Sequence, residues 1–496
     1  MKPISRRPRL SFSVARGWLN DPNGLVFFAG EYHLFFQYYP YGIEWGPMHW
    51  GHAVSTDMVE WQELDIALRP DENGMIFSGS AVVDEDDDSG FFDGGAGLIA
   101  FYTAFRRVAG TDRNEQEQCL AYSRDRGRTW TKYAGNPILK NPGVVDFRDP
   151  KVLRSRKTGK WVMVLSGGDR VFFYGSNNLK DWRRLSEFGI GEAGPQDCIW
   201  ECPDLLHVPG PWPGREQRDL WLLKLSVSNG NPMGGSGEVL VPGHFDGIAF
   251  EALERGRFEW LDYGQDCYAS QSWYLPGSDR ILLISWVSNS LYSGKIPTDG
   301  FWRGILSLPR ELSVERRNGS AVIVQHPVEE IASYAKPPKI LFCGLLTARV
   351  EAGLPNGPLE ISFVSHNLDS FLLEFESDEG DHLSIGLAAT CDGAELTLDR
   401  SAVGTHFLPG VKEVQRIALP ASAARSLSIW YDQSVWQMFI DGGERVSTNL
   451  IFPKGDFSRV RLSPPEPAEG NPGEAHLVVT PYTPTDRATR LAASLP

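Results

Sequence analysis

Three acidic residues, each beside a proline or one residue from it, are the residues of this chain best suited to chemistry. They lie in Asp21-Pro22, Asp149-Pro150 and Glu201-Cys202-Pro203. Proline fixes the local backbone, so it can aim a neighbouring carboxylate. Two carboxylates that face each other across a pocket can cleave a glycosidic bond: one attacks the anomeric carbon while the other protonates the departing oxygen.

Each acid taken alone also has an ordinary structural interpretation. Asn20-Asp21-Pro22-Asn23-Gly24 has good turn chemistry, and on this stretch alone we predict a turn that leads into the apolar strand at 25–28. The three acids lie far apart in the sequence. They can act together only if the fold brings them to one place.

A repeated pattern indicates such a fold. A Ser, then an Asp or Asn two residues later, then a Trp that opens the next strand, recur at 55–61, 123–130 and 176–182, with a weaker copy at 242–250. Copies about 50 to 70 residues apart have the size of a four-stranded propeller blade. A set of unrelated hairpins is the alternative interpretation.

Short strands begin near Asn23, Phe77, Arg148, Glu201 and Tyr268, and most are followed by a more apolar strand. This pattern predicts five blades across roughly residues 15 to 315. The first strand of each blade lines the central channel of a propeller, so the polar residues at these five starts would converge on one pocket. The three acids are among them.

The chain changes character after Ala335-Lys336-Pro337-Pro338-Lys339, which indicates a linker. Beyond it, segments such as 359–363 alternate apolar with polar residues, as half-buried strands do, and Asp441-Gly442-Gly443 predicts a hairpin turn. We therefore predict an all-β chain, with a five-bladed β-propeller at 1–330, a linker at 331–340 and a β-sandwich at 341–496.

Bulk composition excludes several classes of partner. With 496 residues the chain is long enough for two or more domains, and its net charge of −15 argues against nucleic acid or an anionic membrane. No apolar run could span a membrane, and the basic start lacks the apolar segment of a signal peptide. We expect a cytoplasmic protein, or a secreted one whose leader is absent from the sequence. The chain has six cysteines and no Cys-x-x-Cys pair, so we predict buried free thiols. The sequence leaves the oligomeric state open.

The segments 18–24, 147–150 and 201–205, which contain the three acids, resemble the signature motifs of glycoside hydrolase family 32. That family contains invertases, inulinases, levanases and related fructosyltransferases. Similar segments follow in the expected order at 37–40, 45–53, 77–80, 262–269 and 308–312, so the resemblance covers the whole first domain, and the sandwich fits too. It implies a retaining β-fructofuranosidase acting on sucrose or on fructans such as levan and inulin, without a metal or other cofactor.

The resemblance also implies roles for individual residues. Asp21 is similar to the nucleophile, Glu201 to the general acid/base, and Asp149 to the acid that holds fructose hydroxyls and stabilises the transition state. The positions similar to those that shape the fructose pocket are Asn20, Gln37, Trp45, Phe77, Ser78, Arg148 and Trp286.

Elementary chemistry agrees with these roles. The amides of Asn20 and Gln37 can bond vicinal hydroxyls, and a cation such as Arg148 beside Asp149 favours the ionised carboxylate. For Phe77 and Trp286, ordinary packing within a blade is an equally good interpretation.

Two segments depart from the family pattern. After Trp286 the family often continues toward a second Trp, where this chain has Ser288-Asn289-Ser290-Leu291-Tyr292, and Gln437 replaces a frequent Glu in the sandwich. The first change affects the expected pocket rim, so substrate length and acceptor choice stay open.

Two alternative functions also stay open. One is a fructosyltransferase, including the levan fructotransferase type that releases a difructose dianhydride. The other is a carbohydrate-binding propeller without activity, although a binder has no need of a nucleophile paired with an acid. Linkage preference, between β-2,1 and β-2,6, and exo or endo action also remain undecided.

Overall fold

The computed structural model describes residues 6–108, 110–111, 113–189, 191–209, 219–317, 320–368, 370–404, 408–464 and 473–484. Nearly all regular structure in these ranges is strand. The exceptions are two short 3₁₀ helices, η1 (Ser293–Lys295) and η2 (Glu329–Tyr334). Within the same ranges no helix is long and apolar enough to cross a membrane. The all-β prediction is confirmed.

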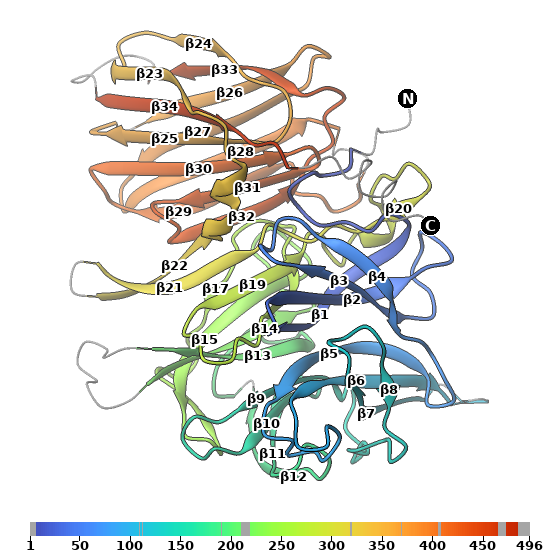
Figure 1. Ribbon diagram of the computed structural model, residues 1–496. Coiled ribbons are helices and arrows are strands. Elements are labelled where there is room, and N and C mark those ends of the chain that lie inside the picture. The colour runs from blue at the N-terminus through green and yellow to red at the C-terminus, as the bar shows by residue number, and fades with distance from the viewer. Residues whose placement is uncertain are drawn as a thin grey trace.

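Five sheets follow one another between residues 17 and 327 (Figure 1). The first contains β1 (Gly17–Phe28), β2 (Glu31–Tyr39), β3 (His49–Ser55), β4 (Gln62–Leu68) and the short β20 (Trp302–Arg303). The second contains β5 (Met75–Asp84), β6 (Gly97–Arg107), β7 (Asn114–Ser123) and β8 (Thr131–Lys132). The third contains β9 (Arg148–Arg154), β10 (Trp161–Ser166), β11 (Arg170–Ser176) and β12 (Arg183–Gly189).

The fourth sheet contains β13 (Trp200–Val208), β14 (Leu220–Val227), β15 (Gly237–Phe245), β16 (Phe250–Ala252) and β17 (Glu259–Trp260). The fifth contains β18 (Tyr268–Ser272), β19 (Ile281–Trp286), β21 (Arg310–Arg317) and β22 (Ser320–Pro327). The first strands of the sheets contact one another in a closed cycle, β1 to β5, β9, β13, β18 and back to β1. The arrangement is a β-propeller whose inner ring consists of these strands.

Late residues close the ring against early ones. β20 pairs in parallel with the start of β1, and the Leu306 amide donates to the Phe12 carbonyl at 2.8 Å. The two ends of the propeller are therefore hydrogen-bonded to each other, which fixes the first sheet beside the fifth.

The repeated Ser-Asp-Trp pattern forms the connection between the third and fourth strands of a sheet. In the first copy, Asp57 accepts the Val59 and Glu60 amides, and the Trp61 indole donates to the Met58 carbonyl at 2.9 Å. The Trp130 and Trp182 indoles donate to equivalent carbonyls in the second and third sheets. The recurrence in sequence therefore reflects a recurring turn.

The second domain is a β-sandwich of two six-stranded sheets, drawn above the propeller in orange to red in Figure 1. One sheet contains β23 (Lys339–Leu345), β34 (Glu474–Pro481), β25 (Leu359–His366), β30 (Ala424–Asp432), β31 (Val435–Ile440) and β32 (Arg445–Leu450). The other contains β24 (Val350–Gly353), β33 (Phe457–Ser463), β26 (Phe371–Ser377), β27 (His382–Thr390), β28 (Gly393–Ala402) and β29 (Val414–Pro420). The predicted hairpin turn at 441–443 joins β31 to β32.

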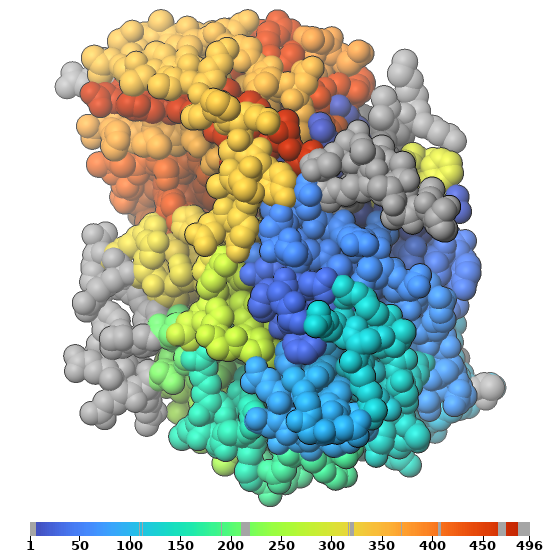
Figure 2. All heavy atoms as spheres, viewed as in Figure 1, coloured from blue at the N-terminus to red at the C-terminus, as the bar shows by residue number. Residues whose placement is uncertain are grey.

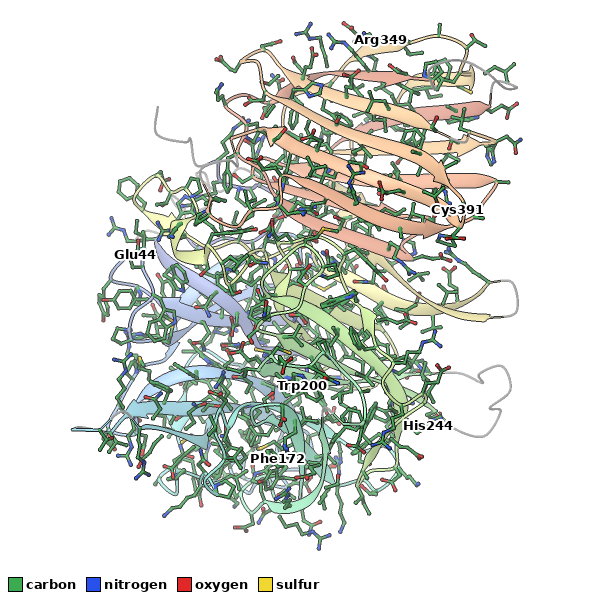
Figure 3. All side chains as sticks on the ribbon, turned by 180° about the vertical axis from the view of Figure 1, so that it is seen from behind. Glu44, Phe172, Trp200, His244, Arg349 and Cys391 are labelled. Carbon is green, nitrogen blue, oxygen red and sulfur yellow. The ribbon has the colours of Figure 1, made fainter. Side chains whose placement is uncertain are left out.

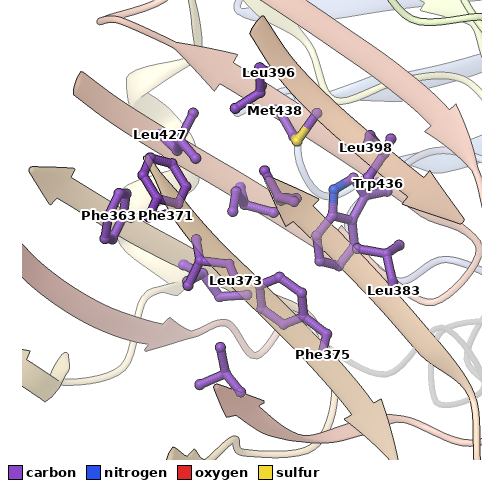
Figure 4. Close-up of a cluster of buried hydrophobic side chains, with 14 of the residues drawn as sticks. Phe363, Phe371, Leu373, Phe375, Leu383, Leu396, Leu398, Leu427, Trp436 and Met438 are labelled. Carbon is purple, nitrogen blue, oxygen red and sulfur yellow. The ribbon is translucent and has the colours of Figure 1, made fainter. Parts of the chain in front are cut away.

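The sandwich core forms because inward and outward side chains alternate along its strands. In β25 every second residue is buried, and Phe363 from this strand meets Phe371, with ring centroids 4.5 Å apart. Figure 4 shows Phe371, Leu373 and Phe375 of one sheet together with Trp436 of the other. The segment 331–340, predicted as a linker, contains the end of η2 and the first residues of β23.

The two domains meet through buried charged groups. Arg400 of the sandwich pairs with Asp266 of the propeller at 3.0 Å. Arg310 pairs with Asp262 within the propeller at 3.0 Å and donates to Gln437 of the sandwich at 3.1 Å; all four charged side chains are completely buried. In Figure 2 the atoms of the sandwich (orange to red) lie directly on those of the propeller (blue to green). One buried ion pair and buried hydrogen bonds therefore link the two domains.

Two sequence-based expectations are wrong. Residues 20–24 do not form a turn between strands but lie inside β1, which begins at Gly17 and is irregular there. All six cysteines are free, yet only Cys119, Cys202 and Cys267 are buried, whereas Cys343 and Cys391 are exposed. Turn-forming residues also suit a bulged strand, which explains the first error.

Candidate active site

A cavity of about 340 Å³ contains all ten residues predicted for the site. It also contains six residues that were not predicted: Trp18, Glu44, Cys202, Tyr268, Ser293 and Gly294. Trp200, which directly precedes Glu201, lies near the middle of the propeller in Figure 3. The inner strands therefore bring the three distant acids to one place.

The pairing of every inner strand with its neighbour is irregular beside the cavity. The register shifts within β1, β5, β13 and β18, and for β9 it shifts in the partner strand β10. The shifts lie between Leu19 and Pro22, Ile76 and Gly79, Glu201 and Asp204, Tyr268 and Gln271, and Val164 and Ser166. A bulge breaks the strict alternation of a strand and re-aims its side chains. This local irregularity is what turns acid and hydroxyl groups into the cavity.

Asp149, Cys202 and Ala269 show the irregularity most clearly, because their φ angles are 66°, 43° and 52°. Residues with a Cβ rarely adopt this left-handed backbone, so the surrounding sheet must impose it. Two of the three line the cavity. The site thus includes two residues in a strained backbone conformation, as is common where geometry serves function.

Asp21 is held by short hydrogen bonds to both carboxylate oxygens. The Asn20 amide donates to Oδ1 at 2.9 Å, and the Ser78 hydroxyl donates to Oδ2 at 2.6 Å. Asn20 is itself oriented, because its Oδ1 accepts the Trp18 indole at 2.8 Å. Burial raises the pKa of Asp21 and the nearby Glu201 adds to this, while the bonds from Ser78 and Asn20 lower it.

Asp149 is the most deeply buried of the three acids. Its Oδ2 accepts the Cys202 backbone amide at 2.9 Å, and its own amide donates to the Thr103 hydroxyl at 3.0 Å. Burial raises the pKa of Asp149 to about 7; Arg148 and the Cys202 amide lower it, whereas the charges of Glu201 and Asp21 raise it. The expectation that Arg148 keeps this acid ionised is therefore outweighed by burial.

Glu201 is held from two sides. Arg148 Nη2 donates to its Oε1 at 2.9 Å, and the Tyr268 hydroxyl donates to its Oε2. Burial opposes the charge of Arg148, yet Glu201, Asp149 and Asp146 together hold the pKa of this guanidinium above its usual value. Burial and the Glu201 charge raise the pKa of Tyr268 well above normal, so its hydroxyl stays a donor.

Cys202 lies between two of the acids. Its thiol is 3.7 Å from Asp21 Oδ2 and 3.7 Å from Asp149 Oδ2. Burial raises its pKa well above the usual value, and the adjacent carboxylates raise it further, so the sulfur stays a thiol. This agrees with a packing role and not with a reactive one, but the backbone amide of Cys202 also serves Asp149 directly.

Two buried lysines support the backbone beneath the acids. Lys224 Nζ donates to the Cys202 carbonyl at 2.7 Å and to the Ser270 carbonyl, and it pairs with Glu238 at 3.3 Å. Lys151 pairs with Asp204 at 2.9 Å. Lys224 thus provides a hydrogen-bond donor to backbone carbonyls in two bulged segments.

The amides and aromatic residues occupy the walls. Gln37 donates to Asn23 Oδ1 at 2.8 Å and to the Ile76 carbonyl at 3.0 Å, so its NH₂ group is used within the protein. Trp45 is 48% exposed. Phe77 packs edge-on to it and stacks on Phe105, with ring centroids 4.4 Å apart. Phe77 therefore both lines the cavity and packs within its blade, the two roles that the sequence left open.

Trp286 is nearly buried and packs edge-on to Trp18, with ring centroids 6.1 Å apart. It lines the cavity while belonging to the packed core. In the part of the chain that the structure describes, no three His, Cys, Asp or Glu side chains are grouped as a metal site.

Tyr268 and Cys202 were missed for different reasons. Tyr268 begins the fifth inner strand, a position visible in the sequence, but a tyrosine at the start of a strand is equally typical of ordinary packing. The contribution of Cys202 comes from its backbone amide and left-handed φ, for which the residue type gives no signal.

Comparison with known proteins gives consistent matches over both domains. The model of the glycosyl hydrolases family 32 N-terminal domain matches residues 12–327, and the family 32 C-terminal model matches residues 356–475. The chain is 42% identical over 461 residues to a levanase of Bacillus subtilis, a match covering 90% of this chain and 66% of that protein. It is 34% identical over 502 residues to an extracellular exo-inulinase of Aspergillus awamori, covering 92% and 91% of the two chains.

Solved structures give the same result. The exo-inulinase from Aspergillus awamori superposes with a TM-score of 0.86 at 31% identity, over 97% of this chain and 99% of that one. A β-fructofuranosidase from Schwanniomyces occidentalis, complexed with fructosyl-erythritol, gives 0.81 at 27% identity, over 96% and 97%.

Proposed function

Because the chain belongs to glycoside hydrolase family 32 and is a glycoside hydrolase, we propose that it is a retaining β-fructosidase that removes fructosyl units from sucrose or fructans. The observation that carries the mechanism is the convergence of Asp21 and Glu201 in one cavity, which Asp149 and Arg148 also line. The relatives named levanase and exo-inulinase support fructans as the substrate class.

In the first step, Asp21 attacks the anomeric carbon of the fructosyl unit while Glu201 gives its proton to the departing oxygen. The glycosidic bond breaks and a covalent fructosyl ester forms. In the second step, Glu201 takes a proton from water, the water oxygen attacks the same carbon, and the Asp21 ester bond breaks. Two inversions give fructose with its configuration retained.

The hydrogen bonds of the site fit these roles. Ser78 and Asn20 hold the Asp21 carboxylate with donors alone, which stabilises the ionised form that a nucleophile needs. Asp149, the third acid of the cavity, would bond fructose hydroxyls and stabilise positive charge that develops on the ring. Its own charge is disfavoured by burial, so a cationic transition state would be stabilised more strongly than a neutral substrate.

The experiment compares Asp21→Ala and Glu201→Ala with the wild type on sucrose, inulin and levan, with product analysis. We expect turnover to fall by about 10²- to 10⁴-fold or more, because a nucleophile or a proton donor is lost, while circular dichroism stays unchanged. Free fructose, released as the β-anomer before mutarotation, is expected from the wild type.

Near-normal activity in either variant would contradict the assignment of the acids. Dianhydrides or longer chains as the main products would identify a transferase that uses the same acids. An α-anomer would exclude retention. Glu254→Ala, a surface carboxylate paired with Arg257 and absent from the cavity, serves as the control.

A further inference from the structure

Glu44 is a charged cavity residue with no role in the two chemical steps. It lies beside Trp45 on the loop between β2 and β3, and its side chain is 67% exposed. Figure 3 labels it at the edge of the propeller. The acids come from the inner strands, whereas Glu44 comes from a loop, so it belongs to the mouth of the cavity and not to its floor.

A buried cation orients this exposed side chain. Arg303 donates to Glu44 Oε1 at 2.6 Å and to the carbonyls of Ile43 at 3.0 Å and Ile296 at 3.1 Å. An ion pair with one exposed partner adds little stability. Its clear effect is geometric, because the hydrogen bonds of one guanidinium link the Glu44 loop to the segment that follows η1.

The second oxygen of Glu44 lies close to Gly294 of η1, another residue that lines the cavity. A Cβ placed on Gly294 would lie 3.8 Å from Glu44 Oε2, and both Ser293 and Gly294 line the cavity. Trp45 presents an exposed indole next to this carboxylate. A carboxylate that accepts hydroxyl donors, beside an aromatic face, is a combination suited to a neutral sugar.

We propose that Glu44 binds the sugar unit on the leaving-group side of the scissile bond, the glucosyl of sucrose or the next fructosyl of a fructan. This inference depends on the proposed function: a fructosyl unit at Asp21 leaves its neighbour at the mouth. The same position would hold an acceptor sugar. Its hydroxyl would then give a proton to Glu201 and attack the fructosyl carbon as the ester bond to Asp21 breaks, in place of water.

The test compares two substrates that differ only in the leaving group: sucrose, and methyl β-D-fructofuranoside, which releases methanol. For Glu44→Ala we expect the ratio of kcat/KM on sucrose to kcat/KM on the methyl glycoside to fall about tenfold, mainly through KM, as one hydrogen bond to a partly exposed carboxylate would give. Glu44→Gln keeps an oxygen for Arg303 and should give a smaller fall. At high sucrose, transfer products should decrease relative to free fructose in Glu44→Ala.

An unchanged ratio would overturn the inference, whether both substrates lose activity, which would make Glu44 a support for the loop, or neither does. Failure of the wild type to hydrolyse either substrate would instead refute the proposed function. The matched control is Glu254→Ala, since Glu254 is 62% exposed, pairs with Arg257 at 3.0 Å and does not line the cavity. Its ratio should equal that of the wild type.

Discussion

Asp149 is the residue whose pKa shows most clearly how burial and neighbouring charges compete. Burial raises its pKa to about 7, and the nearby Arg148 does not compensate because Glu201 and Asp21 add negative charge to the same cavity. In the unfolded chain the same group has an ordinary pKa near 3.8. The folded protein therefore binds a proton here, between about pH 4 and pH 7, that the unfolded chain does not bind.

Asp149→Asn should consequently change how stability depends on pH. A group whose pKa is raised on folding contributes stability that is present below its unfolded pKa and is lost as pH rises through about 7. Asparagine cannot ionise, so the variant should gain stability relative to the wild type between pH 4 and pH 8, by a few kcal/mol at about 1.4 kcal/mol per pKa unit. Urea unfolding at the two pH values measures this difference. A difference that does not vary with pH would show that Asp149 titrates normally.

Single residues of the site were predictable where the residue type carries the role. The three acids and the wall residues have side chains whose chemistry is evident, and a ring of inner strands brings them together. Cys202 was not predictable, because its contribution is an amide group that every residue except proline possesses. The raised pKa of Asp149 also could not be predicted, since the burial that causes it is set by the whole fold.

At the scale of elements, the inner strands depend on irregularity. A regular strand would send alternate side chains to opposite faces, whereas the bulges present Glu201, and the backbone amide of the residue after it, to the same cavity. The positions of these strands were predictable from the sequence, but Asp21-Pro22-Asn23-Gly24 was predicted as a turn. Proline, asparagine and glycine favour irregular backbone, and local sequence does not say whether the chain reverses or continues.

Ala269 offers a test of this imposed backbone. It is fully buried, with φ of 52°. Ala269→Gly loses a methyl group and gains unfolded entropy, but it relieves about 1–2 kcal/mol of left-handed strain, so stability should change by less than about 1 kcal/mol.

Ala81 of β5 is the matched control, because it is equally buried on an inner strand without positive φ. Ala81→Gly has no strain to relieve and should cost about 1–2 kcal/mol. Thermal unfolding compares the two variants. Equal losses would mean that the bulge at Ala269 is unstrained.

At the scale of the whole molecule, buried charge joins the domains. Arg310 donates to Asp262 at 3.0 Å and to Gln437 at 3.1 Å, and it also donates to Thr448. Gln437 is the position where the family often has Glu. In this chain its neutral oxygen accepts a hydrogen bond from a guanidinium that Asp262 already neutralises.

Arg310→Met should destabilise the protein by about 3–5 kcal/mol, because Asp262 would be left buried without its cation. The double variant Asp262→Asn/Arg310→Met removes both charges and should lose less. Calorimetric unfolding measures both effects. If the double variant lost as much stability as Asp262→Asn and Arg310→Met lose in sum when made separately, charge pairing would not be the cause.

The order and class of the domains were predictable from strand patterns and the recurring turn. Their interface was not, because Arg310, Arg400, Asp262 and Asp266 belong to no repeat and their partners lie up to 186 residues away. Only the folded chain shows that these charges share one buried layer.

The interface also reaches the mouth of the cavity. Asp266, which pairs with Arg400 of the sandwich, accepts the hydroxyl of Tyr292, and Tyr292 directly precedes Ser293. Recombining a propeller from one relative with a sandwich from another at the linker alone would cut this connection. Chimeras that keep residues 262–266 and 288–292 matched to their own sandwich would preserve it, so the exchangeable unit in this architecture is larger than the domain that the chain order suggests.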